Sequence, residues 1–251
     1  MGVRQSWLQA TLWTAQDVHP PLYFWHLWAW VRLAGESEFA ARYLSALWGT
    51  LTVAVAYALA ARLGGRRTGL LCALLLAVTR FHIWWSQEMR MYVLAALAAT
   101  LTLYCAVRWL AGQAAPAGPG SAPPRAAYWL AGYTLSAVAG MYTIYMAGLA
   151  PLVANVYALT FVPQWLGHRR WRTLLTWLAA QVCALICLAP WLWLALPRMR
   201  SWSVAQPFSL RLLATLYGTL LAVGVSTDVE RLWPYALPFA AVCVGALLTL
   251  W

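Results

Sequence analysis

Long apolar stretches follow one another through most of this chain, and they restrict its fold more than any other feature. Hydrophobic residues make up 63% of the 251 positions and charged residues only 9%, whereas about a quarter of an ordinary soluble domain is charged. A bilayer core about 30 Å thick is crossed by about 20 helical residues. The sequence therefore predicts an all-α, polytopic membrane protein with about seven to eight transmembrane helices.

The predicted spans are apolar stretches separated by short polar turns. They are Phe39–Leu63, Gly69–Trp85, Arg90–Ala111, Ala126–Tyr145, Ala147–Trp165, Arg172–Leu196, Phe208–Val225 and Leu232–Trp251. Of these, Phe208–Val225 can equally lie along the membrane surface. The tryptophan-rich stretch Pro21–Ala34 is too short to cross comfortably, so we expect a helix in the membrane interface. We expect one membrane-embedded domain over 1–251, with 1–38 on the outer face and 39–251 forming the bundle.

Arginine supplies all 17 basic residues and gives a formal net charge of +11. In a membrane protein this excess indicates orientation and contact with anionic lipid, not nucleic acid. Basic residues occupy alternate turns between the spans, at Arg62, Arg66, Arg67, Arg108, Arg125, Arg169, Arg170 and Arg172. By the positive-inside rule these turns face the cytoplasm. The turns at Ser86–Tyr92, Met141–Met146 and Pro197–Trp202 then share the outer side with Asp17–Leu22.

The segment Asp17-Val18-His19-Pro20-Pro21-Leu22 places an acid and an imidazole beside paired prolines. Two adjacent prolines fix two φ angles and remove two backbone donors, and they hold the preceding residues extended. A carboxylate and an imidazole fixed at the membrane boundary suit chemistry on a lipid-linked substrate. The alternative is an ordinary proline-bounded helix start in which Asp17 is a cap.

Five arginines on the predicted outer side run against the positive-inside bias, namely Arg42, Arg80, Arg90, Arg198 and Arg200. Arg42 stands a few residues inside a predicted span, where an ionisable group usually faces a partner or a wet cavity. A guanidinium suits phosphate because its planar fork makes two parallel charge-assisted hydrogen bonds. The alternatives are an ion pair of Arg42 with Glu36 or Glu38, and pairing of Arg90 with Glu88 or with lipid headgroups.

Three motifs in this order resemble landmarks of one family. They are Asp17–Leu22, then Glu38–Arg42 followed by Ser45-Ala46-Leu47 and Gly49, then Ser86–Tyr92. The chain resembles the polytopic glycosyltransferase C superfamily, in the branch of bacterial relatives of protein O-mannosyltransferases and lipid A aminoarabinose transferases. The resemblance covers Gln16–Trp109, and the remainder matches in general hydropathy.

The resemblance implies an inverting transfer of a sugar from a polyprenyl-phosphate donor. The acceptor is a protein, lipid or glycan at the extracytoplasmic face of the bacterial plasma membrane. Asp17 and His19 match positions that line the catalytic site, and Arg42 matches an arginine that contacts the donor phosphate. Some relatives use a divalent metal ion, so Asp17 and His19 are also candidate ligands, although two residues do not make a metal site.

The motif Ser86–Tyr92 has an open role in the family. We expect Glu88, Arg90 and Tyr92 to contribute to substrate binding, because the motif lies on the same predicted face as Arg42.

The chain departs from the family pattern at its start. In the family, a first span and a long outer loop with the catalytic acid precede the proline motif. Here 16 residues precede Asp17, and none is acidic. Either Asp17 has taken that role or the chain is part of a longer enzyme, and we expect the second. The alternatives are a non-catalytic fragment of such an enzyme and, less favoured, a lipid or solute transporter, which would typically show internal duplication and broken helices.

Overall fold

The structure, a computed structural model, describes residues 6–16, 19–114, 126–167, 171–198, 209–224 and 228–248. Within these ranges it contains helices and no strand, as predicted. The first elements are α1 (Trp7–Ala15), α2 (Leu22–Ala34), α3 (Glu38–Val78), α4 (Arg80–Gln87) and α5 (Tyr92–Ala114). They are followed by α6 (Ala126–Met141), η2 (Tyr145–Gly148), α7 (Leu149–Leu159), α8 (Val162–Gly167) and α9 (Trp171–Ala195). The last are α10 (Leu210–Val223), α11 (Val229–Leu232), η3 (Trp233–Tyr235) and α12 (Ala236–Leu248).

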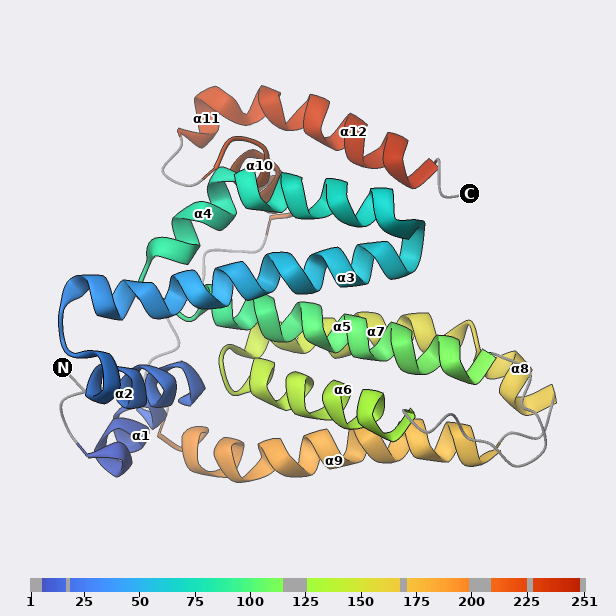
Figure 1. Cartoon of the computed structure of the whole chain (residues 1–251), viewed down its shortest axis with the longest axis horizontal. Helices are drawn as coiled ribbons and strands as arrows, with labels where there is room; N and C mark the ends of the chain where they lie inside the picture. Colours follow the sequence, from blue (N-terminus) through green and yellow to red (C-terminus); the bar gives the residue numbers. More distant parts are fainter. Residues whose placement is uncertain are drawn as a thin grey trace.

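The long helix α3 consists of two antiparallel legs. At Gly65 the backbone takes φ 86° and ψ 174°, a region that is essentially restricted to glycine, and the chain turns back on itself (Figure 1). The returning leg comes so close that a Cβ at Gly69 would lie 2.7 Å from a side chain of the first leg. The predicted spans Phe39–Leu63 and Gly69–Trp85 therefore pair as one helical hairpin.

Three helices of the described residues are long and apolar enough to cross a membrane, namely α3, α5 and α9. The segment of η2 with α7, and α10, are apolar but shorter. Several predicted spans are shorter or divided in the structure. The span Gly69–Trp85 is interrupted at Thr79, Ala126–Tyr145 ends early as a helix, and Ala147–Trp165 is shared between α7 and α8. The protein is a polytopic helical membrane protein, as expected.

The described arginines of the alternating pattern gather at one end of the bundle. Arg62 and Arg67 flank the reversal of α3, Arg108 lies near the end of α5, and Arg172 lies at the start of α9. These positions share the right-hand end in Figure 1, whereas α2, the α4–α5 turn, the α6–η2 turn and the end of α9 lie at the left-hand end. This is the alternation that the arginine pattern predicts. Three further arginines of the pattern, Arg125, Arg169 and Arg170, lie outside the described residues.

Polar side chains join α6, α7 and α9 inside the bundle. The Gln181 Oε1 atom accepts hydrogen bonds from Tyr133 Oη at 2.8 Å and from Asn155 Nδ2 at 3.1 Å. Trp177 Nε1 donates to Asn155 Oδ1 at 2.8 Å, and the rings of Tyr133 and Trp177 lie 4.7 Å apart. These four residues form the α6–α7–α9 network, and two of them, Tyr133 and Trp177, belong to a buried cluster that also contains Trp109. The network satisfies its own polar groups and fixes the arrangement of three helices.

Helix α1 is an element that hydropathy alone does not predict. Ser6 Oγ accepts from the Gln9 N–H, and the Gln9 side chain accepts from the Ser6 N–H, a reciprocal capping box. The helix buries Thr11 and Thr14 and exposes Trp7 and Trp13. The capping pattern is visible in the sequence and is the signal that could have identified this helix.

Candidate functional site

Helix α2, which directly follows the proline motif, the start of α3 and the α4–α5 turn meet at one end of the bundle. One buried cluster draws residues from all three, namely Tyr23, Leu27, Ala41, Leu44, Met91 and Leu94. Motifs that are far apart in the sequence therefore share one small core. This confirms the prediction that they lie on the same face.

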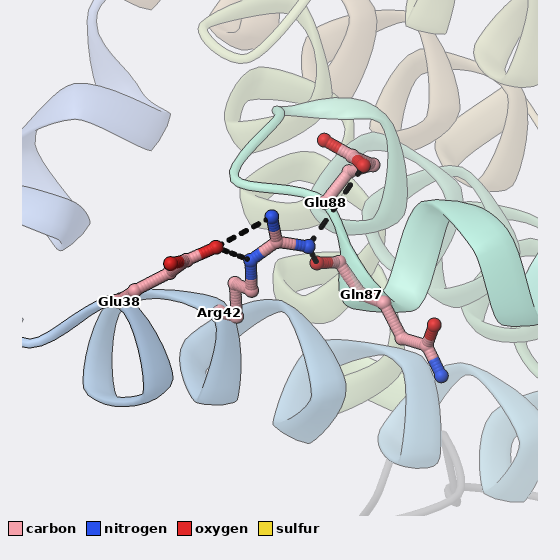
Figure 2. Close-up of polar contacts among 4 residues, drawn as sticks. All are labelled: Glu38, Arg42, Gln87 and Glu88. Carbon is pink, nitrogen blue, oxygen red and sulfur yellow. Dashed lines mark hydrogen bonds and ion pairs between the residues drawn. The ribbon is translucent and has the colours of Figure 1, made fainter.

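Arg42 lies at the centre of this group, one turn into α3. Its Nη2 atom lies 2.8 Å from Glu38 Oε1, and its Nε donates to the same oxygen at 3.0 Å. Its Nη1 donates to the Gln87 carbonyl at 3.1 Å and lies 3.9 Å from Glu88 Oε1 (Figure 2). The Arg42–Glu38 ion pair, which the sequence left open as an alternative, is present. Arg42 also joins α3 to the α4–α5 turn, and its side chain is 45% exposed, so a ligand can reach it.

The α4–α5 turn arranges its charges differently from the expectation. Among the described ion pairs, Glu88 contacts Arg42 and not Arg90. The Arg90 N–H donates to the Glu88 carbonyl at 2.8 Å, and the Arg90 side chain is exposed. Tyr92 begins α5, where its ring packs 4.2 Å from that of Trp85. The turn that contacts Arg42 therefore also carries a second guanidinium and a partly exposed phenol.

Gly49 explains how α4 comes to lie against α3. His82 Nε2 lies 3.2 Å from the Gly49 carbonyl oxygen. A Cβ at this position would lie 2.9 Å from the Cβ of Ser86, closer than atoms in proteins pack. The missing side chain lets the two helices touch, and this contact sets the position of the following residue, Gln87, whose carbonyl binds Arg42.

Tyr23 of α2 is a site residue that sequence patterns did not single out. It stands in a run of aromatic residues that indicated only an interfacial helix, yet its side chain is 2% exposed. Burial raises the pKa of Tyr23 to about 12, although the neighbouring Ser45 hydroxyl and the charge of Arg90 act in the opposite direction. The phenol is therefore protonated at physiological pH and is a hydrogen-bond donor next to the charged turn.

A backbone hydrogen bond joins the proline motif to the α6–η2 turn. The Leu22 N–H donates to the Tyr142 carbonyl in the α6–η2 turn at 2.9 Å. His19 is half-buried and directly precedes the prolines. Asp17 lies outside the described residues, so its catalytic role and its alternative role as a helix cap both remain predictions.

The ends of α6 and α9 complete this side of the molecule. Tyr142 Oη donates to the Cys187 carbonyl at 2.8 Å, and Trp191 Nε1 donates to Tyr145 Oη at 3.0 Å. Ala15, at the end of α1, is buried in the same cluster as Trp191. The α6–η2 turn and the end of α9 therefore converge on the proline motif, as the alternation of turns predicts.

Of the two predicted metal ligands, Asp17 and His19, the structure describes His19. In the described ranges, no three His, Cys, Asp or Glu side chains gather closely enough to hold a metal ion. Asp17, the acid of the candidate pair with His19, is not among the described residues. Metal binding by this pair remains a prediction.

These features define a class: a helical, polytopic membrane protein with an arginine-centred candidate site at one end of its bundle. The family described as dolichyl-phosphate-mannose-protein mannosyltransferase matches residues 18–194, which is more than half of the chain. The chain belongs to this family, within the glycosyltransferase C superfamily, as the three sequence motifs predict.

The fold is similar to that in the crystal structure of ArnT from Cupriavidus metallidurans in the apo state, with a TM-score of 0.58 and 18% sequence identity. The similarity covers 89% of this chain and 44% of the ArnT chain. The present chain thus spans less than half the length of that protein. Among curated proteins, no sequence matches significantly.

Proposed function

We propose that this chain is part of a membrane glycosyltransferase that moves a sugar from a polyprenyl-phosphate donor to an acceptor protein, lipid or glycan. The reaction takes place at the extracytoplasmic face of a bacterial plasma membrane. The observation that supports this proposal most directly is the placement of Arg42, which is exposed at the bundle end opposite the arginine-rich turns. Membership of the mannosyltransferase family supports a lipid-linked sugar as donor.

The contacts of Arg42 suit a phosphate ligand. A guanidinium has five N–H donors. Glu38 accepts from Nε and forms an ion pair with Nη2, and the Gln87 carbonyl accepts from Nη1, which also lies 3.9 Å from Glu88 Oε1. One further donor on Nη1 and one on Nη2 remain for two parallel bonds to a phosphate. Because the engaged donors hold the guanidinium in place, its orientation is set before the ligand binds.

In the proposed reaction, a hydroxyl of the acceptor attacks the anomeric carbon of the sugar while the bond from that carbon to the phosphate oxygen breaks. An acidic residue accepts the hydroxyl proton as general base, and Asp17 and His19 of the proline motif line the site. The polyprenyl phosphate leaves with an added negative charge, which Arg42 stabilises. Arg90 and Tyr92 lie on the neighbouring turn, where they contact the donor headgroup.

The decisive test is Arg42→Ala in the full-length enzyme, assayed for sugar transfer from a polyprenyl-phosphate donor. We expect kcat to fall by about 100-fold or more, as for the loss of one oxyanion-stabilising donor. Arg66→Ala, at the opposite end of the bundle, is the matched control and should retain activity. Turnover of Arg42→Ala close to that of the wild type would contradict the proposal.

The role of Asp17 is tested in the same assay. We expect Asp17→Ala to abolish transfer without loss of donor binding, since the donor phosphate is held elsewhere. Transfer at the wild-type rate would show that another acid is the base.

A further inference from the structure

A groove with a volume of about 780 Å³ lies between α6 and α9. Both helices begin at the end of the bundle where the arginines of the alternating pattern gather, the arginine-rich end, and they run side by side from there (Figure 1). Residues one or two helical turns apart on each helix line this α6–α9 groove, among them Ala127, Ala131 and Leu135 of α6 and Arg172, Thr176 and Cys183 of α9.

The groove is apolar along most of its length and is open to the surroundings of the bundle. The hydroxyls of Thr134 and Thr176 donate to backbone carbonyls of their own helices, at 3.0 Å and 2.6 Å, and Leu135 is 70% exposed. From Arg172 to Cys183 the groove follows α9 for about 16 Å, at 1.5 Å per residue. This length is about half of a hydrocarbon core ~30 Å thick, so the groove has the depth of one leaflet.

The charge of the groove lies at its arginine-rich end. Arg172 is the one charged residue among the described residues that line it, and its side chain is exposed. The sequence contains no Asp or Glu between Glu88 and Asp228, and in the described part of the chain no ion pair involves Arg172. The Arg108 guanidinium, by contrast, lies 4.4 Å from the ring centroid of Trp129, a cation–π contact. Helices α5 to α9 therefore offer Arg172 no carboxylate.

We propose that the α6–α9 groove binds one anionic phospholipid from the leaflet at the arginine-rich end, with an acyl chain along the groove and the phosphate at Arg172. Basic pockets between transmembrane helices on the cytoplasmic side bind such headgroups, and a guanidinium makes two parallel charge-assisted hydrogen bonds to a phosphate. The site lies at the opposite end of the bundle from Arg42. It is therefore separate from the proposed donor site and does not depend on sugar transfer.

The bound lipid stabilises the protein, because it contacts α6 and α9 together and binds only when the two helices are packed side by side. A ligand that binds the folded state alone raises the stability of that state.

The test measures lipid retention by the full-length enzyme in detergent, by native mass spectrometry. The protein is titrated with phosphatidylglycerol, which is anionic, and with phosphatidylcholine of the same acyl chains, which is neutral overall. Arg172→Gln removes the charge of the groove, and Ala131→Phe fills its apolar part. The matched controls are Arg67→Gln, at an exposed arginine of the same end, and Leu178→Phe, at an exposed residue of α9 that does not line the groove.

We expect the wild type to retain one phosphatidylglycerol with at least about tenfold higher affinity than phosphatidylcholine, as hydrogen bonds to a charged group imply. Arg172→Gln should bind the two lipids equally, and Ala131→Phe should bind both at least about tenfold more weakly. Both controls should behave as the wild type does. Phosphatidylglycerol should raise the thermal unfolding midpoint of the wild type and leave that of Ala131→Phe unchanged.

Four results would overturn the proposal. Equal affinity of the wild type for the two lipids would remove the role of Arg172. The same loss in Arg67→Gln as in Arg172→Gln would show attraction to surface charge without a defined site. Displacement of phosphatidylglycerol by excess polyprenyl phosphate would assign the groove to that lipid. Absence of any retained lipid would show that another part of the full-length enzyme covers the groove.

Discussion

Buried polar groups have different hydrogen-bond partners in the α6–α7–α9 network and at the α2–α3 interface. In the network, the hydroxyl of Tyr133 and the amides of Asn155 and Gln181 bond to one another across three helices. At the α2–α3 interface, the hydroxyls of Tyr23 and Ser45 are just as buried, and they lie beside each other without bonding to a third helix in the described part of the chain. The network lies within the helical bundle, whereas the interface borders the charged turn at its outer end.

Hydrogen bonds between helices affect the stability of the bundle. A hydrogen bond between membrane helices contributes about 0.6 kcal/mol on average, whereas leaving a buried hydroxyl unbonded costs about 1–3 kcal/mol. The hydrogen bonds of the network therefore stabilise the bundle, and breaking one of them would cost more than it contributes. The α2–α3 interface packs against the turn that contacts Arg42.

The largest effect on stability is expected from Trp177→Ala in the network. Trp177 is buried, bonds to Asn155 and packs against Tyr133 and Trp109. Removing a core tryptophan leaves a cavity and costs about 3–5 kcal/mol, measured by denaturant unfolding in detergent. A loss below about 1 kcal/mol would show that the network does not hold the helices together.

The contact between α3 and α4 is tested by Gly49→Ala. The added methyl group would collide with Ser86, so we expect a loss of about 1–3 kcal/mol from overpacking. Sugar transfer should also fall, because the α4–α5 turn shifts away from Arg42. Gly167→Ala is the matched control, since a Cβ there meets nothing within 4 Å. Equal behaviour of the two variants would contradict the close approach.

A smaller loss is expected from Gln181→Leu. The substitution keeps an apolar helix face but leaves Tyr133 and Asn155 without a shared acceptor. We expect a loss of about 1–2 kcal/mol in unfolding free energy with unchanged turnover per folded molecule. A fall in turnover at constant stability would mean that the network takes part in the reaction.

The smallest change in stability is expected from Glu38→Gln. The Glu38 side chain is 74% exposed, and exposed ion pairs contribute about 0–1 kcal/mol. The unfolding free energy should therefore change by less than about 1 kcal/mol, and even less at high salt. A larger loss would show that Arg42 and Glu38 form a structural element of α3 as well as part of the site.

Sequence patterns predicted much of the architecture for identifiable reasons. The arginines at alternate turns, such as Arg62, Arg108 and Arg172, predicted which turns share an end. The short tryptophan-rich stretch predicted α2. The patterns did not predict that the helix is interrupted at Thr79, or that Arg42 contacts Glu88. Both features depend on the packing of α4 against Gly49.

Tyr23 shows most clearly what the sequence patterns could not predict. In the sequence it is one aromatic residue among several at a membrane interface, and its neighbours Phe24 and Trp25 look equivalent. Only the approach of α2 to α3 distinguishes it, since that approach buries its hydroxyl beside Ser45.

The amino-acid sequence by itself determined that this is a helical membrane protein whose aromatic turns lie opposite its arginine-rich turns. Hydropathy and charge are properties of short segments. The bilayer selects a segment by these local properties, independently of distant parts of the chain. The tertiary structure alone decided which partners Arg42 has, which tyrosine is buried and which polar groups remain unbonded. Those outcomes depend on contacts between side chains of separate helices, and a local sequence pattern does not predict such contacts.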